Sequence, residues 1–131
     1  MATKRINNIN TPVNYNEVVY HKDITVKDVD YLQFSADTTN NIILISTGIT
    51  ENILIDYKTV RGDSVKSGIL EIIYDPSDNT IFIDDTEYSE IYLSGVTFDA
   101  DINNGNIRLQ VFIDDSSLDN ADFNYSIKYF K

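Results

Sequence analysis

The stretch that decides the fold is VTFDADINNGNIRLQVFI, residues 96–113, in which apolar and polar residues alternate on both sides of an Asn-Gly pair. Side chains of a β-strand repeat every two residues, so each half of the stretch places its apolar residues on one face. Asn104 and Gly105 favour the positive φ angles of a tight turn between paired strands. The stretch therefore predicts a β-hairpin whose apolar residues meet across the ladder: Val96, Phe98, Ala100 and Ile102 from one strand, and Ile107, Leu109, Val111 and Ile113 from the other.

Similar short segments recur along the chain and leave little room for helices. The sequence is rich in isoleucine, valine, threonine and tyrosine, which suit a pleated and half-buried surface. Segments rich in aspartate, asparagine and serine separate the strands, among them a turn expected at 84–87. We therefore predict an all-β fold, an antiparallel and jelly-roll-like β-sandwich. Its expected strands are 15–20, 24–27, 31–35, 42–46, 53–60, 68–74, 80–83, 88–93, 96–102, 107–113 and 123–130.

The length of 131 residues and the absence of cysteine are typical of one domain with a core of its own. Residues 1–12 are polar and show neither a helical nor a strand period, so we expect a flexible N-terminal arm. Residues 13–131 are expected to form a single β-sandwich domain. No apolar run is long enough to cross a bilayer, and no signal-peptide core is visible. We expect no membrane partner.

The formal net charge of −11 is concentrated in the second half of the chain. Residues 61–131 hold fourteen acidic side chains against five basic ones, whereas residues 1–60 hold seven against five. A surface of this kind repels a phosphate backbone, so we expect no nucleic-acid partner. Solubility and protection of exposed strand edges explain the acidic residues most simply.

Several expected strands are apolar on both faces. Ile69, Ile73, Phe112 and Phe130 occupy positions opposite the core-facing residues of their strands. In a lone sandwich these positions should be polar. Two explanations remain open, namely cover by loops or by the N-terminal arm, and contact between identical subunits. We predict that these four residues contribute to an oligomer interface.

The sequence offers no pattern specific for catalysis. His21 is the only histidine, and no nucleophile motif or orienting partner marks a triad around it. Carboxylates are so numerous that a matched pair carries no specificity. We therefore predict no enzymatic activity, no catalytic residues and no cofactor.

Three features of the sequence bear on metal and ligand binding. Five acidic residues between 75 and 87 could supply oxygen ligands to calcium, but their spacing matches no known calcium loop. Turn formation explains them, so we predict no metal site, and the same holds for the weaker group Asp114, Asp115 and Asp119. Arg61-Gly62-Asp63 spells an integrin-type tripeptide, but a hairpin turn accounts for it. The tyrosines least clearly buried, which leave carbohydrate binding open, are Tyr15, Tyr20, Tyr88 and Tyr92.

From Ile55 to the C-terminus the chain resembles a β-module found at the ends of bacteriophage tail-fibre and other virion appendage proteins. The resemblance covers roughly the last 75 residues and rests on strand and turn patterns, none of them catalytic. It implies a homotrimeric structural β-domain. The segments that carry it are Ile55-Asp56-Tyr57 with Arg61, then Lys66 to Ile72, Gly95 to Phe98, Gly105 to Leu109, and Ala121 to Tyr129.

The chain begins with methionine, and no coiled coil or shaft repeat precedes this module. We therefore expect a small virion component, made in the bacterial cytoplasm, that decorates or cements a capsid or forms part of a short spike. Its expected partners are copies of itself, most simply in a trimer, and other virion proteins such as the capsid shell. Lys4 and Arg5 form the only basic pair in the chain and are the expected attachment residues. The alternative is a receptor- or glycan-binding tip, which requires exposed tyrosines and carboxylates to converge in a concave site.

Overall fold

A computed structural model of the chain describes residues 18–20, 24–48 and 52–130, with side chains from Leu32 onward. These residues form nine strands and no helix. The bounds of the strands are β1 (Val18–Tyr20), β2 (Ile24–Phe34), β3 (Thr38–Ser46), β4 (Asn52–Arg61), β5 (Ser64–Asp75), β6 (Thr80–Ile91), β7 (Val96–Asn103), β8 (Asn106–Ile113) and β9 (Ala121–Phe130).

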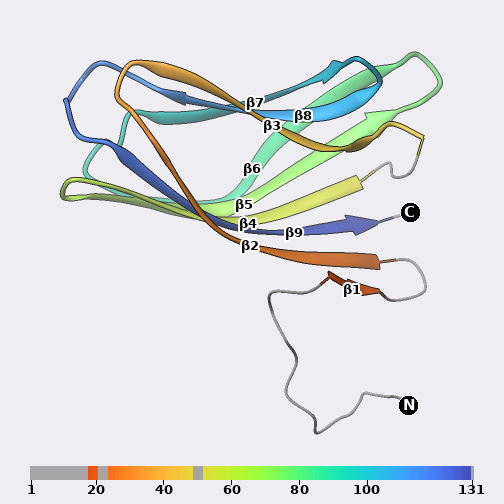
Figure 1. Cartoon of the computed structure of the whole chain (residues 1–131), viewed down its shortest axis with the longest axis horizontal. Helices are drawn as coiled ribbons and strands as arrows, with labels where there is room; N and C mark the ends of the chain where they lie inside the picture. Colours follow the sequence, from red (N-terminus) through yellow and green to blue (C-terminus); the bar gives the residue numbers. More distant parts are fainter. Residues whose placement is uncertain (1–17, 21–23, 49–51, 131) are drawn as a thin grey trace, which may run out of the picture.

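The strands pack as two antiparallel sheets, which confirms the predicted β-sandwich. The larger sheet has the order β1-β2-β9-β4-β5-β6, and the smaller sheet, with the order β3-β8-β7, lies against it (Figure 1). The chain passes from the larger to the smaller sheet between β2 and β3 and again between β6 and β7, and it returns to the larger sheet between β3 and β4 and between β8 and β9. Since β2 pairs with β9 and β3 with β8, these four strands form the wrapped ribbon typical of a jelly roll. In contrast, β4, β5 and β6 remain side by side in one sheet.

The hairpin predicted from residues 96–113 is confirmed as β7 and β8. Val96 is paired with Ile113 and Ile102 with Ile107, in an unbroken register. Asn104 and Gly105 adopt φ angles of 51° and 76°, the left-handed conformation that a two-residue hairpin turn requires.

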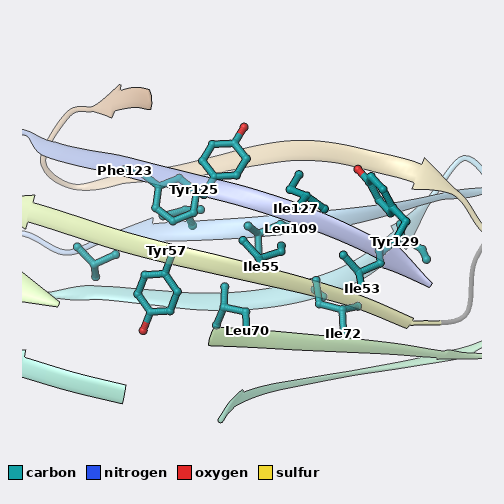
Figure 2. Close-up of a cluster of buried hydrophobic side chains, with 14 of the residues drawn as sticks. Ile53, Ile55, Tyr57, Leu70, Ile72, Leu109, Phe123, Tyr125, Ile127 and Tyr129 are labelled. Atoms are coloured by element: carbon teal, nitrogen blue, oxygen red, sulfur yellow. The ribbon is translucent and has the colours of Figure 1, made fainter. Parts of the chain in front are cut away.

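The core lies between the sheets and is built from the inward positions of alternating strands. Phe123, Ile53, Ile55, Ile72 and Leu109 are completely buried. Figure 2 shows the inner side chains of β4, β5 and β9 gathered against β8. Aromatic rings fill one part of this core, where the rings of Phe123 and Tyr125 lie 4.7 Å apart. Burial of alternate residues fixes the register, because a slip of one residue would expose the apolar set of a strand.

Two predicted breaks between strands were wrong, and both errors have the same physical cause. Segments 24–27 and 31–35 belong to the single strand β2, and segments 80–83 and 88–93 are joined in β6, so that no turn exists at 84–87. Each merged strand has a register shift where the sequence pattern changes phase, near Asp30 and at Thr86. A β-bulge adds one residue without ending the strand, so a change of phase imitates a turn in the sequence.

Candidate functional site

The four predicted interface residues lie on opposite faces of the sandwich. Ile69 and Ile73 on β5 and Phe130 on β9 occupy outward positions of the six-stranded sheet. Phe112 occupies an outward position of β8, in the three-stranded sheet. The structure therefore brings three of these residues to one surface of the chain and places Phe112 on the other.

An apolar row, interrupted by Asn52 on β4, crosses the outer face of the six-stranded sheet near one end of its strands. Phe130 and Ile73 both align with Asn52, and Ile73 is paired with Phe82 of the edge strand β6. The residues Ile73 and Phe82 are 43% and 60% exposed. Phe82 was missed by the sequence analysis, although the signal was present, because it lies between the inward residues Ile81 and Ile83.

The outer face of the three-stranded sheet is mainly polar. The position next to Phe112 on each neighbouring strand is a threonine, Thr39 on β3 and Thr97 on β7. Further along β8, the guanidinium of Arg108 donates two hydrogen bonds to Asp101. The expectation of apolar residues on both faces therefore holds for the larger sheet rather than for the smaller one.

The acidic residues between 75 and 87 do not converge. Asp75 accepts hydrogen bonds from the amide and hydroxyl of Ser77, which hold the pKa of Asp75 below its usual value. Asp78 accepts from Thr80 in the same turn, while the carboxylate of Asp85 accepts from the Tyr57 hydroxyl at 2.6 Å. Within the part of the chain that the structure describes, no three His, Cys, Asp or Glu side chains are placed to hold a metal ion.

Arg61 organises the loops at the opposite end of the sandwich. It is 3% exposed and donates five hydrogen bonds, to the carbonyls of Ser94, Asp114, Ser117 and Asp119 and to the Asp114 carboxylate. Since a guanidinium has five N–H donors, its capacity is fully used. The arginine of the Arg-Gly-Asp tripeptide thus points into the structure, and Gly62, at φ 57°, makes the β4–β5 turn. Hydrogen bonds from Ser116 and Arg61 hold the pKa of Asp114 below its usual value.

Lys66 joins the two sheets near the same end. Its buried ammonium donates to the carbonyl of Val96 on β7 at 2.9 Å. The nitrogen lies 4.6 Å from the ring centroid of Tyr88 and 5.2 Å from that of Phe98, which are favourable cation–π distances. Burial lowers the pKa of Lys66, against the opposing influence of Asp85 and Glu90.

A surface hollow of about 280 Å³ opens over this region, between β6 and β7. We call it the Tyr88 hollow. Its lining includes Lys66, Tyr88, Glu90, Leu93, Thr97 and Asp114. Burial opposes the ionisation of Glu90, but hydrogen bonds from Ser94 and Tyr88 outweigh it and keep the pKa of that carboxyl below its usual value. A second hollow of about 230 Å³ lies on the other side of Thr97 and shares Gly95 and Asp114 with the first.

The remaining candidate residues from the sequence fall into two groups, those outside the described residues and those on the surface. Lys4, Arg5, Tyr15 and His21 lie outside the described residues, as does the whole arm 1–12, and the side chain of Tyr20 does too. Tyr88 and Tyr92 are exposed, as predicted, by 52% and 72%. Of the two, Tyr88 lines the hollow together with the carboxylates of Glu90 and Asp114.

Comparison with known proteins found no family model that matches the chain and no curated protein that matches it significantly. Among the described residues, no helix is long and apolar enough to span a membrane.

Proposed function

We propose that this chain is a non-enzymatic structural protein of a bacteriophage virion, which decorates or cements the capsid or forms part of a short spike. The resemblance of residues 55–131 to virion appendage modules supports this proposal. In it, copies of the chain associate through the outer face of the six-stranded sheet, most simply as a trimer, and the arm with Lys4 and Arg5 attaches them to the acidic capsid shell.

The observation that carries the proposal is the apolar row on that face. Ile73 and Phe82 are neighbours in the ladder and expose large apolar surfaces. The half-buried Leu54 and Ile69 lie further along the same face, each between charged residues on its neighbouring strands. Removing such surface from water stabilises an association by about 25 cal/mol per Å² of apolar area. An interface of roughly 800 Å² on each partner is enough for specific assembly. The mainly polar face that carries Phe112 is then left to solvent.

The occupant of this face is proposed to be a second copy because the face carries both apolar and charged side chains that a copy can match. Along the sheet from the apolar row, Lys128 lies 3.9 Å from Asp56, so charges of both signs border the apolar surface. Such a border gives an interface its polar rim.

Light scattering coupled to size-exclusion chromatography tests the assembly at micromolar concentration. We expect a mass three times that of the 14.9 kDa chain. Ile73→Asp and Phe82→Asp should give folded monomers, because each places a charge in the contact but leaves the core unchanged. Phe112→Asp is the matched control on the other face and should remain a trimer. A wild-type protein that is monomeric alone and with its virion partners would refute the proposed assembly.

Electron microscopy of the labelled virion tests the position of the protein. A ring of copies on the shell supports decoration, whereas a position at the distal end of a tail would favour a receptor- or glycan-binding tip. Deletion of residues 2–11 is expected to leave the protein folded and to empty its sites on the particle. Fully occupied particles after this deletion would overturn the assigned role of the arm.

A further inference from the structure

We propose that the Tyr88 hollow binds one unit of an uncharged sugar. This inference is independent of the proposed assembly, because the hollow opens between the two sheets rather than on the outer face that carries Ile73 and Phe82.

The bulge in β6 builds the hollow. Ile69 is paired with Glu87 and Leu70 with Asp85, so Thr86 is the additional residue. In a regular strand, Glu87 would lie on the same inner face as Asp85, and Tyr88 and Glu90 would point outward. The bulge reverses this alternation, so Tyr88 and Glu90 turn toward β7. The partner strand is adapted to this geometry, since a Cβ at Gly68 would come within 1.7 Å of the Glu87 carbonyl oxygen. Glycine opposite the bulge and the bulge itself therefore act together to aim Tyr88.

Hydrogen bonds hold the polar groups of the hollow in place before any ligand arrives. Glu90 accepts from the Tyr88 hydroxyl and from the amide and hydroxyl of Ser94, and the Ser94 carbonyl accepts in turn from Arg61. Asp114 accepts from Arg61 at 2.7 Å through Oδ1, and its carboxylate is half exposed. Groups that are already fixed lose less entropy when they bind a ligand.

These groups match the two kinds of surface on a sugar ring. The C–H face of a sugar can pack on the part of the Tyr88 ring that Lys66 leaves exposed and on Leu93, which is 88% exposed. Sugar hydroxyls can donate to the carboxylates of Glu90 and Asp114 and can exchange hydrogen bonds with the exposed hydroxyl of Thr97. A volume of about 280 Å³ lies just below the usual range for ligand pockets, which fits one ring rather than an extended chain.

The charges of the hollow favour an uncharged ligand over an ion. Glu90 and Asp114 repel an anion. A cation would have to approach beside Lys66, whose ammonium already faces the ring of Tyr88 at 4.6 Å. Polar but uncharged hydroxyls face neither of these penalties.

NMR titration of the ¹⁵N-labelled full chain tests the proposal with four probes: glucose, galactose, mannose and N-acetylglucosamine. We expect saturable shifts of residues 88–97 and 114–116 with at least one of them, and a dissociation constant on the order of 1 mM for a single ring. Tyr88→Ala should weaken this binding at least tenfold, whereas Tyr88→Phe should keep most of it. Phe82→Ala removes an aromatic ring from the same strand outside the hollow and is the matched control. It should bind as the wild type does.

Three results would overturn the inference: no saturable shift with any of the sugars, shifts confined to other residues, or unchanged binding by Tyr88→Ala. Tighter binding of phosphate or tetramethylammonium than of every sugar would also refute an uncharged ligand. If Tyr88→Ala does not fold, Thr97→Phe fills the hollow from an exposed position and should abolish the shifts. Tyr88→Ala should retain the oligomeric state of the wild type, so loss of sugar binding is distinguished from loss of assembly.

Discussion

Replacement of Arg61 by methionine should strongly destabilise the domain. The change keeps an unbranched stem but deletes five hydrogen bonds, four of them to backbone carbonyls of residues 94–119. Hydrogen bonds to a charged donor contribute about 1.5–3 kcal/mol each. Simple addition would give an excessive sum, because the carbonyls of the exposed residues Asp114 and Asp119 regain water when the arginine is lost.

We therefore expect a loss of about 3–5 kcal/mol in the free energy of unfolding, the range found when one partner of a buried pair is removed. For a domain of this size this corresponds to a melting temperature lower by roughly 10–20 °C. The ion pair with the half-exposed Asp114 carboxylate accounts for only a small part of this loss in stability, since exposed ion pairs contribute about 0–1 kcal/mol.

Urea denaturation followed by circular dichroism measures the loss, with all variants at one protein concentration because association adds to apparent stability. Arg108→Met is the matched control, since Arg108 also donates two hydrogen bonds to an aspartate but does so on the outer face of the smaller sheet. Arg108→Met should lower the free energy of unfolding much less than Arg61→Met does. If Arg61→Met costs less than about 1 kcal/mol, or no more than Arg108→Met, then Arg61 does not hold the loops together as argued.

Two further predictions concern pH and metal. Burial raises the pKa of Tyr129 to about 12, so this tyrosine adds stability that is complete below the ordinary value near 10 and is lost as the pH rises from 10 to 12. The free energy of unfolding should fall by about 2–3 kcal/mol more in the wild type than in Tyr129→Phe over this range, and equal slopes would contradict the assignment. Thermal melting curves with excess EDTA and with millimolar calcium should coincide, because Asp75 and Asp78 are bonded within their own turn. A calcium-dependent rise of several degrees would show that these residues form a metal site.

The sandwich could be predicted because alternation and turn chemistry are local signals. The hairpin of residues 96–113 shows both, and its register in the structure is the one that the alternation demands. The arrangement of strands within the sheets is not local. Nothing in the sequence of β8 indicates that it belongs to a different sheet from β9, so Phe112 was grouped with Phe130 although the two face opposite sides of the molecule.

The Tyr88 hollow was beyond sequence reasoning for a related reason. Tyr88 was recognised as a tyrosine without a clear place in the core, but the bulge at Thr86 that aims it was interpreted as a turn at 84–87. Its partners Lys66, Thr97 and Asp114 come from β5, β7 and the loop after β8, and only the packing of the two sheets brings them together. The role of Arg61 was hidden in the same way, because four of its five hydrogen bonds go to backbone carbonyl groups, which every residue carries.

The position of β9 also determines when the protein can fold. This strand lies between β2 and β4, so it separates two strands that are made long before it. Until β9 has left the ribosome, β2 has no partner on one side, β4 exposes an unpaired edge, and the core lacks Phe123 and Ile127. Pairing between such distant segments is slow, since the loop must close before the contacts form. The nascent chain thus waits for β9 with two open edges, and in that interval association with other copies through these edges competes with folding.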